Sequence, residues 1–598
     1  MATIPGMFSG DCSTNGTADT NKLAVVIKHQ GKKYNVDLDP SANGEMLKLQ
    51  LFSLTGVEPE RQSVLIKGGK LKDDTDLSKL NAKPGQIFTM LGTASGESSA
   101  VIAPSEKPKF VEDMSEAEAA AQEGATPAGL QNLGNTCYLN STLQVLRSIP
   151  EMQDSLKIYK PDMGAGPSLQ DLSRLGLGGL SSTGDLTAQL RDLYKQMSET
   201  QEGFPPLMFL NALRNVYPQF AQKAKNGNGY AQQDAEEAWS QILHQLRQKL
   251  KITDKSTQEQ KDIAFIDRYM AGSFHSSLAP PPEVGDSEPV VESEETFLKL
   301  DCHIDQSINH LRDGILAALT EDIEKRSPTL ERDAKYIKTS RISRLPKYLT
   351  VHFVRFFWRR DIQKKTKIMR KVTFPEELDI VEFCTDDMKK RLIPVRDKVR
   401  DIRKDEQDVE RARKRQKLAH KQEEDRKHDE AMKDVEAAPI AKLREQKEKE
   451  EGKKKEQEGG EMDVYKTDAE YEAERAASIK QAKKELFALI DPELAADEGS
   501  NKSGLYELRG VITHQGASAD SGHYTSFVKK QGRLVDDPKA PGGKRREEDG
   551  KWWWFNDDKV SEVDSDRIMT LSGGGESASA LILLYRAIDL PTKDEVED

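Results

Sequence analysis

A cysteine and a histidine, two residue types that together can do covalent chemistry, occur in this chain in settings that suit catalysis. Cys137 lies in the run GLQNLGNTCYLNSTLQ, residues 129–144. After its Gly-Asn turn, leucines recur at i, i+4 and i+7, which predicts a helix that begins at Thr136 or Cys137. A cysteine in a first helical turn lies near unpaired N–H groups and the positive end of the helix dipole, which lowers its pKa. The sequence therefore predicts a nucleophilic thiolate at Cys137.

A nucleophilic cysteine needs a base, and the base needs a group that orients it. His523 lies in the run GHYTSF, and Asn556 follows the aromatic run WWWF; both runs are typical of strands. If the two strands pair antiparallel, the start of the first lies beside the end of the second, so His523 lies beside Asn556. We predict that Asn556 accepts the imidazole Nδ1–H, which leaves Nε2 to take the thiol proton.

The other cysteines and histidines make weaker candidates. Cys302 and His303 are adjacent on a predicted strand, so their side chains point to opposite faces. Cys384 follows an apolar run and is predicted to pack, while Cys12 lies in a polar tail. His514, in the run VITHQG, is predicted to be a structural hydrogen bonder. A cysteine at a helix start is by itself most simply a small buried hydrophobe, and only the two motifs together favour catalysis.

The composition limits the function classes. The 598 residues carry 89 Lys and Arg against 101 Asp and Glu, a net charge of -12, which argues against nucleic acid as the main partner. The 4 cysteines are far apart and form no CxxC pair, which excludes a disulfide scaffold and a cysteine-rich zinc site. The chain has neither a signal peptide pattern nor an apolar run of about 18 residues, so we expect a soluble intracellular protein and no membrane partner.

Helix and strand patterns occur in two blocks of the sequence, which we expect to be the folded parts. Residues 21–93 read β-β-α-β-β, a compact α+β module, after a disordered tail at 1–20. A flexible linker rich in Gly, Ser, Ala, Pro and Glu follows at 94–125. The second block, 126–592, holds most of the aromatic residues and so most of the core, and a tail closes the chain at 593–598.

A stretch of almost solid Lys, Arg, Glu and Asp, residues 398–480, interrupts the second block. It sustains no apolar heptad, which counts against a coiled coil. We interpret it as an insertion that is helical in part and solvated, with too little apolar content to join the core. The alternative is a charged docking arm.

The motifs resemble those of the ubiquitin-specific protease family. GLQNLGNTCYLNSTLQ is similar to its Cys box, GHYTSF with WWWFNDDKV to its His box, GYAQQDAEEAW (229–239) to its intermediate box and GGGESASALILLYR (573–586) to its closing segment. The first module resembles ubiquitin along its length, and this combination resembles the proteasome-associated branch of the family. The resemblance implies an α+β chain: a β-grasp ubiquitin-like domain, then a papain-like catalytic domain of thumb, palm and fingers with a charged, partly helical insertion.

The resemblance assigns roles to four residues of the reaction centre. Cys137 is the nucleophile, His523 the general base, and Asn132 the side chain whose amide donates to the oxyanion. Asn556 takes the third position, where the family often has Asp, and Asp557 is its neighbour rather than the match. Many family members carry a CxxC zinc site in the fingers; this sequence has none, so we predict no metal and no cofactor.

The resemblance also implies residues that contact the tail of ubiquitin. Acidic side chains of the intermediate box would suit its arginines, and the His box would line the channel: Gln233, Asp234, Glu236, Glu237, Ser521, Gly522 and Tyr524. The alternative for the box is a helix with solvated acids over a Trp239 core. Two segments, 359–370 and 515–522, match family loops that can lie over the channel, and we predict that they are mobile and that the free enzyme is weakly active.

The ubiquitin-like module has a predicted partner surface. Its last strand runs into Leu91-Gly92-Thr93 without a Gly-Gly end, so the module is expected to be a built-in ubiquitin mimic rather than a conjugation tag. Ubiquitin binds partners through an apolar patch, and Leu65, Phe88 and Met90 are predicted to lie on it here. Phe88 and Met90 share one strand face, and the alternative is that part of this set is core.

Together these features predict a thiol-dependent deubiquitinase that hydrolyses the bond at the C-terminal glycine of ubiquitin. Its expected partners are ubiquitin, ubiquitinated proteins and the regulatory particle of the 26S proteasome, on which the first module would dock, in the cytoplasm and nucleus. The alternative from another class is a mainly non-catalytic, ubiquitin-sensing regulator of the proteasome. Intact Cys137, His523 and Asn132 favour the enzyme.

Overall fold

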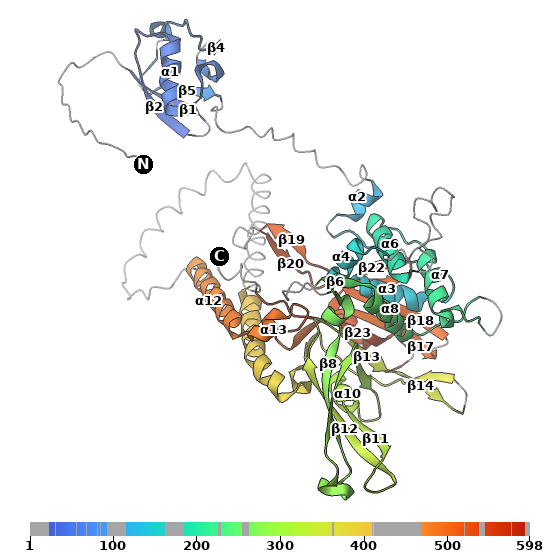
Figure 1. Cartoon of the computed structure of the whole chain (residues 1–598). Helices are drawn as coiled ribbons and strands as arrows, with labels where there is room; N and C mark the ends of the chain where they lie inside the picture. Colours follow the sequence, from blue (N-terminus) through green and yellow to red (C-terminus); the bar gives the residue numbers. More distant parts are fainter. Residues whose placement is uncertain are drawn as a thin grey trace, which may run out of the picture. The chain divides into compact units, whose positions relative to one another are not determined.

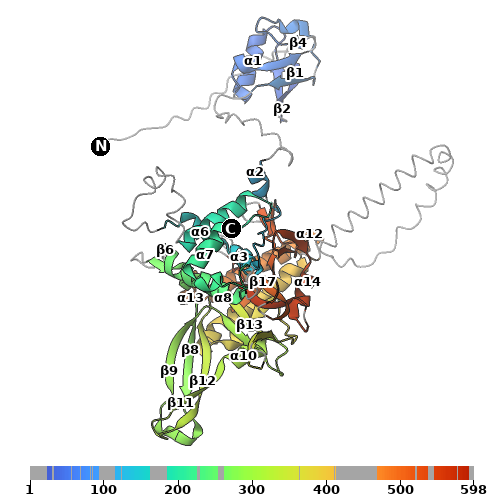
Figure 2. The same ribbon diagram turned by 90° about the vertical axis from the view of Figure 1, so that its right-hand side faces the viewer.

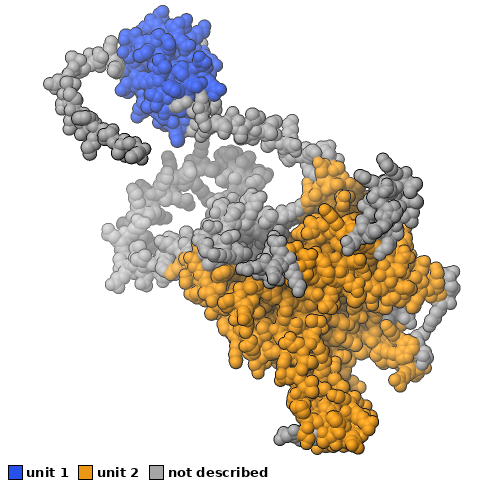
Figure 3. All heavy atoms as spheres, in the orientation of Figure 1, with its two compact units in different colours: residues 1–112 blue, residues 113–598 orange. Residues whose placement is uncertain are grey.

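The computed structural model of the chain consists of two compact units, 1–112 and 113–598 (Figure 3). It describes residues 23–591 except 30–31, 56, 67–68, 81, 84, 93–114, 123, 162–184, 225–228, 254–261, 362–363, 410, 412–467, 519–520, 537–543 and 576. The predicted N-terminal tail and most of the predicted linker lie outside the described residues. Within the described part, no helix is long and apolar enough to cross a membrane.

The first unit is a five-stranded mixed sheet with one long helix, α1 (Gly44–Thr55), packed on it (Figure 1). The strand order is β2-β1-β5-β3-β4, and β1 pairs parallel with β5. The strands are β1 (Leu23–His29), β2 (Lys32–Leu38), β3 (Ser63–Ile66), β4 (Gly69–Lys70) and β5 (Ile87–Leu91). Val25, Ile27, Leu47 and Leu51 are among its core residues. This is the α+β module that the sequence predicts.

The predicted partner surface of this unit needs a correction. Phe88 and Met90 do share one face of β5, but that face is the buried one, and both side chains lie in the core at 5% and 1% exposure. The opposite face of β5 presents Ile87 and Leu91 to solvent, and Leu65 is exposed on the neighbouring strand β3. Alternation along a strand was predicted correctly, but the choice of face depends on where α1 packs.

The second unit begins with a helical layer, the thumb, whose helices surround α3. Except for α2, which buries no residue, these helices form one core through their apolar faces, with Leu139, Leu143 and Leu146 of α3 at its centre. The helices are α2 (Glu116–Ala120), α3 (Cys137–Arg147), α4 (Pro150–Ile158), α6 (Leu186–Glu199), α7 (Leu207–Val216), α8 (Ala235–Lys249) and α9 (Phe265–Tyr269).

A ten-stranded sheet, the palm, faces this layer. Its path is β10-β13-β23-β17-β18-β21-β22, with β14, β15 and β16 joined at the side. The strands are β10 (Leu300–His303), β13 (Tyr348–Val354), β14 (Phe356–Arg359), β15 (Lys364–Lys367), β16 (Glu377–Asp379), β17 (Leu505–Ser518), β18 (Ser521–Lys529), β21 (Trp552–Asn556), β22 (Lys559–Val563) and β23 (Ser579–Ala587). Tyr524 of β18 and Ile512 of β17 join the thumb core, so the palm packs against α3.

A separate four-stranded sheet, the fingers, projects away from the palm (Figures 1 and 2). Its strand order is β11-β12-β8-β9. Strands β6 and β7 form a separate two-stranded sheet, and so do β19 and β20. The remaining elements are β6 (Lys251–Thr253), β7 (Asp262–Ala264), β8 (Gly272–Ala279), β9 (Val291–Phe297), α10 (Leu311–Ala318), β11 (Thr320–Arg326), β12 (Asp333–Arg344), β19 (Arg533–Asp536), β20 (Lys544–Glu547) and α14 (Ser565–Met569).

The ends of the charged stretch are folded and join the core, contrary to prediction. A helix over 386–409 and α12 (Asp468–Leu489), followed by α13 (Pro492–Ala496), flank the region outside the described residues. Val399 and Ile402 of the first helix are buried with Leu486 of α12 in a small apolar cluster. Lys398 pairs with Glu485 across the two helices at 2.6 Å. Sparse apolar residues suffice here because the palm strand β17 and the C-terminal segment complete the cluster.

Candidate active site

Cys137 is the first residue of α3, where the sequence predicts the helix to begin. The turn before it is held by the side chain of Asn132, whose Oδ1 accepts from the main-chain N–H of Gly134 (3.0 Å) and of Thr136 (3.2 Å). Asn135 in this turn has a left-handed φ of 56°. Its amide donates to the carbonyl of Tyr230 at 2.9 Å, which brings the intermediate box beside the nucleophile.

The ionisation of Cys137 differs from the sequence prediction. The side chain is 2% exposed, and this burial raises the pKa of the thiol to about 11. Main-chain hydrogen bonds from Tyr524 and Tyr138 favour the thiolate, and the charge of Asp557 opposes it. The N-terminal position on α3 is as predicted, but the cost of burying the charged sulfur opposes the thiolate there. Burial therefore favours the thiol form of Cys137 in this structure.

His523 and Asn556 come together through two adjacent strands of the palm. Strands β18 and β21 pair antiparallel, with Ser526 opposite Phe555. The imidazole Nε2 of His523 donates to Oδ1 of Asn556 at 2.6 Å. The predicted partnership therefore forms, but through the other ring nitrogen: Nε2 meets Asn556, and Nδ1 is left as the proton acceptor. Because Tyr524 follows His523 and its main chain contacts the Cys137 sulfur, the base and the nucleophile are held side by side.

Asp557 has a larger role than the sequence prediction gave it. Its Oδ1 accepts from the amide of Asn140 (2.8 Å), and its Oδ2 accepts from the amide of Asn132 (3.0 Å). The same carboxylate lies 3.9 Å from Nε2 of His523. Its left-handed φ of 54° places it in the tight turn between β21 and β22, a position that Asp tolerates. The available sequence signal for this contact was only the position of Asp557 directly after Asn556.

The amide of Asn132 therefore has two tasks in this structure. One N–H is directed at Asp557, while the carbonyl oxygen of the side chain orders the turn before Cys137. An amide nitrogen carries two hydrogens, so one remains for an oxyanion. This arrangement suits the role that the sequence implies, because Asp557 fixes the direction in which the amide points.

The acidic residues of the intermediate box begin α8. Asp234 caps this helix by accepting from the main-chain N–H of Glu236 (3.0 Å), and burial raises its pKa. Burial opposes the ionisation of Glu236, but Lys299 at 2.7 Å offsets it and lowers the pKa. Both carboxylates thus have partners inside the protein. Burial raises the pKa of Glu237, and the amide of Gln233 reaches the carbonyl of Ala231 at 3.5 Å.

The predicted channel residues of the His box separate into exposed and buried ones. Ser521 and Gly522 are exposed at the start of β18. The side chain of Tyr524 is fully buried in the thumb core, so only its main chain reaches the site. A contact of Tyr524 with ubiquitin would therefore have to come from its main chain, and its ring packs β18 against α3.

Parts of the two segments predicted to be mobile loops form strands. Phe356–Arg359 and Lys364–Lys367 form the antiparallel hairpin β14–β15, and β17 extends to Ser518. The hairpin is tied to β17 by a bridge between Thr366 and Ser518. Polar contacts replace the apolar content that the sequence lacks: the buried ammonium of Lys367 donates to the carbonyl of His514 at 2.6 Å.

The other described cysteines have no part in this arrangement. Cys302 on β10 and Cys384 after β16 are both fully buried, which raises the pKa of each thiol to about 12. His303 points to the exposed side of the strand, as predicted. Cys12 lies outside the described residues.

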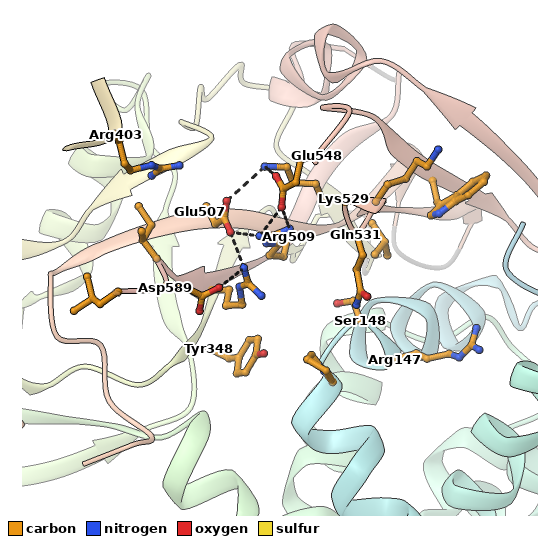
Figure 4. A pocket seen from close by; sticks show the side chains of 18 of the residues that line it. Arg147, Ser148, Tyr348, Arg403, Glu507, Arg509, Lys529, Gln531, Glu548 and Asp589 are labelled. Atoms are coloured by element: carbon orange, nitrogen blue, oxygen red, sulfur yellow. Dashed lines mark hydrogen bonds and ion pairs between the residues drawn. The ribbon is translucent and has the colours of Figure 1, made fainter. Parts of the chain in front are cut away.

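A cleft of about 1050 Å³ in the second unit lies elsewhere, between α3, the palm and the helices on either side of residues 412–467 (Figure 4). Neither Cys137, His523 nor Asn556 lines it. Its charged side chains pair with one another: Arg586 with Asp589 at 3.0 Å, and Arg509 with Glu548 at 3.1 Å. The cleft therefore joins structural elements through ion pairs and adds nothing to the catalytic chemistry.

Both units match known families. Residues 128–585 match the family described as ubiquitin carboxyl-terminal hydrolase, and residues 25–95 match the ubiquitin family. The two matches fall on the two units of the structure, the second on the thumb, palm and fingers and the first on the mixed sheet with α1.

Curated relatives match over nearly the full length. The chain is 39% identical to ubiquitin carboxyl-terminal hydrolase 6 of Schizosaccharomyces pombe, over 95% of this chain and 99% of the relative. It is 35% identical to ubiquitin carboxyl-terminal hydrolase 7 of Arabidopsis thaliana, over 94% and 99%. It is 29% identical to ubiquitin carboxyl-terminal hydrolase 14 of Caenorhabditis elegans, over 94% and 93%. The chain therefore belongs to the ubiquitin carboxyl-terminal hydrolase family, as a cysteine-type hydrolase with an N-terminal ubiquitin-like domain.

Proposed function

We propose that this deubiquitinase docks on the regulatory particle of the proteasome through its ubiquitin-like unit and removes or trims ubiquitin on proteasome substrates there, in cytoplasm and nucleus. The observation that carries the catalytic part is the set of contacts around Cys137: the main chain of Tyr524 on its sulfur, and His523 held by Asn556 at 2.6 Å. These contacts support a site with a nucleophile, a base and an orienting group.

The chemistry follows from these groups. Nδ1 of His523 takes the thiol proton, and the sulfur of Cys137 attacks the carbonyl carbon of the C-terminal glycine of ubiquitin. The free N–H of Asn132 stabilises the oxyanion, and the imidazolium returns its proton to the leaving lysine amine. Water then hydrolyses the acyl-enzyme, with His523 again as base. Asn556 orients the ring throughout but adds no negative charge to stabilise the imidazolium.

Docking is supported by the exposed apolar residues of the first unit. Leu65 is 44% and Leu91 56% exposed on adjacent strands β3 and β5, and Ile87 lies on the same face of β5 as Leu91. An exposed apolar group of this kind favours a protein partner. The sequence after β5 lacks a Gly-Gly end, which fits recognition rather than conjugation. A tethered second contact would raise the effective concentration of the catalytic unit at the proteasome.

The test is hydrolysis of a ubiquitin–fluorophore substrate with and without excess proteasome. We expect stimulation of the wild type, and loss of stimulation at limiting proteasome when Leu65 and Leu91 are both replaced by Ser. Met46→Ser, an equally polar change at an exposed residue of α1, is the matched control and should keep stimulation. Equal stimulation of both variants would contradict docking through the β3–β5 face.

The alternative, a mainly non-catalytic regulator, makes a different prediction. A ubiquitin with a C-terminal electrophile should label Cys137 covalently in the enzyme. If the wild type is not labelled, either alone or with proteasome, the site does not act as a thiol hydrolase.

A further inference from the structure

His514 is a buried histidine that lies next to the two residues flanking the catalytic base in the sequence. It is fully buried in β17, opposite Tyr524 of β18, while its neighbour Gln515 is opposite His523. Alternate residues of a strand share a face. His514 therefore contacts the two residues that flank His523, Gly522 and Tyr524, rather than His523 itself.

The ring of His514 is held between two aromatic rings. It meets Phe356 of the β14–β15 hairpin edge-on, with centroids 5.2 Å apart and planes at 83°. On its other side it meets Tyr524, at 4.7 Å and 62°. Edge-to-face pairs of this kind have a preferred geometry and resist sliding. The position of the hairpin is thereby coupled to that of β18.

The same ring touches the main chain of Gly522. This residue has a φ of +131°, and a Cβ atom there would lie 2.7 Å from Nε2 of His514 and 2.2 Å from the carbonyl oxygen of Gln515. Only glycine allows this approach. The imidazole of His514 therefore contacts the main chain of Gly522, directly before His523. The same imidazole contacts the ring of Tyr524, directly after His523.

The His514 imidazole does not act as a second base. Burial, together with the nearby charges of Lys367 and His523, lowers its pKa to about 3, and a main-chain hydrogen bond with Ser521 opposes this shift. Neither ring nitrogen makes a hydrogen bond of standard geometry to a described residue. The ring nitrogens thus have at most a weak contact with the main chain of Ser521, and a poorly satisfied buried polar group costs about 1–3 kcal/mol of stability.

Lys367 fixes the strand from its other side. Its ammonium group, on β15, donates to the carbonyl of His514 at 2.6 Å. Among the described residues no carboxylate pairs with it, and burial lowers its pKa to about 8. The ammonium of Lys367 is thus held in the interior by main-chain oxygens, one of which belongs to His514.

We propose that His514 is a positioning residue for the catalytic base: its ring, held between Phe356 and Tyr524, sets the main chain of 522–524 and so aims His523 at Cys137. This rests on the proposed roles of Cys137 and His523. A shift of about 1 Å in a catalytic group can cost about a hundredfold in rate. Loosening the ring should therefore lower kcat and leave the binding of ubiquitin intact.

The sharpest test compares two neighbouring phenylalanines of β14. Phe356 contacts His514, whereas Phe357 is exposed on the other face of the strand. In the full-length chain we expect Phe356→Leu to lower kcat about tenfold with KM within twofold, because misalignment acts on the chemical step. Phe357→Leu should keep the wild-type kcat. Equal kcat values for the two variants would overturn the proposal.

His514→Ala should lower kcat further, with rates expressed per folded enzyme. Its control is Tyr506→Phe, which removes a buried hydrogen bond to Pro346 at the far end of β17. If Tyr506→Phe destabilises the protein as much and loses as much kcat, His514 has only a structural role. If His514→Ala does not fold, the phenylalanine pair decides. An inactive wild type would contradict the proposed function itself, a result distinct from equal activity of the two phenylalanine variants.

Discussion

The thiol of Cys137 makes the most direct prediction, because its ionisation can be measured without ubiquitin. Its pKa of about 11 lies above the ordinary value of 9.0. At 1.36 kcal/mol per unit, this difference corresponds to about 2.7 kcal/mol against the thiolate. At pH 7.5 roughly 0.03% of Cys137 would be thiolate, compared with roughly 3% for an ordinary thiol. Since the thiolate is the reactive form, the free enzyme should react about 100-fold more slowly than an ordinary cysteine through ionisation alone.

The assay is alkylation of the folded enzyme by iodoacetamide between pH 6.5 and 9.5, followed by mass spectrometry of the Cys137 peptide. Burial slows the reaction equally at every pH, so the slope reports the ionisation. We expect the rate to rise about tenfold per pH unit without a plateau. Cys384, whose thiol is also buried with a raised pKa, is an internal reference that should show the same slope. Cys137→Ser removes the labelled site and gives the background.

A plateau below pH 9 would refute this reasoning. It would mean that Cys137 and His523 already form a thiolate–imidazolium pair in the free enzyme, as the helix position alone predicts. A further check is Asp557→Asn, which removes a charge that raises the thiol pKa and should speed alkylation at a fixed pH. If the slope is as expected, the binding of ubiquitin or of the proteasome must supply the missing 2–3 kcal/mol, about a hundredfold in rate.

Three further results are expected. Asp557→Asn should lower kcat at least tenfold with little change in KM, because an amide in place of the carboxylate faces the donors of Asn132 and Asn140 with a donor of its own; an effect on KM alone would contradict this. The pKa of His514 is about 3 in the folded protein, against an ordinary value of 6.5. The folded protein therefore keeps its full stability above pH 6.5 and loses stability on acidification, by about 2 kcal/mol at pH 5. Measured by urea unfolding, the His514→Gln variant should not lose this stability on acidification. Equal losses in the variant and the wild type would contradict the prediction. Deleting 412–467 should leave a cooperative thermal transition and normal ubiquitin hydrolysis, whereas deleting 400–480 also removes Ile402 from its cluster and should lower Tm; equal Tm values would contradict the packing of these ends.

Several features of this protein follow from local sequence alone. The start of α3 at Cys137 follows from a turn and a leucine period, and neither depends on the rest of the chain. The meeting of His523 with Asn556 follows from the pairing of two strands that are close in sequence. The opposite faces of Phe88 and Ile87 follow from strand alternation. These are short-range properties, since they depend on backbone geometry over a few residues.

Tertiary structure decided everything that depends on what covers a residue. Alternation cannot say which face of β5 is buried; α1 covers the face with Phe88 and leaves Leu91 in solvent. The helix start predicts a lowered thiol pKa at Cys137, whereas burial raises that pKa, because removing a charged sulfur from water costs free energy. Asp557 meets Asn132 across 425 positions of sequence, a distance over which no periodic pattern extends. Local sequence thus determined where these elements lie and which of their residues share a face. Packing between distant segments determined which face is buried, the pKa of Cys137, the orientation of the His523 ring and the partners of each buried polar group.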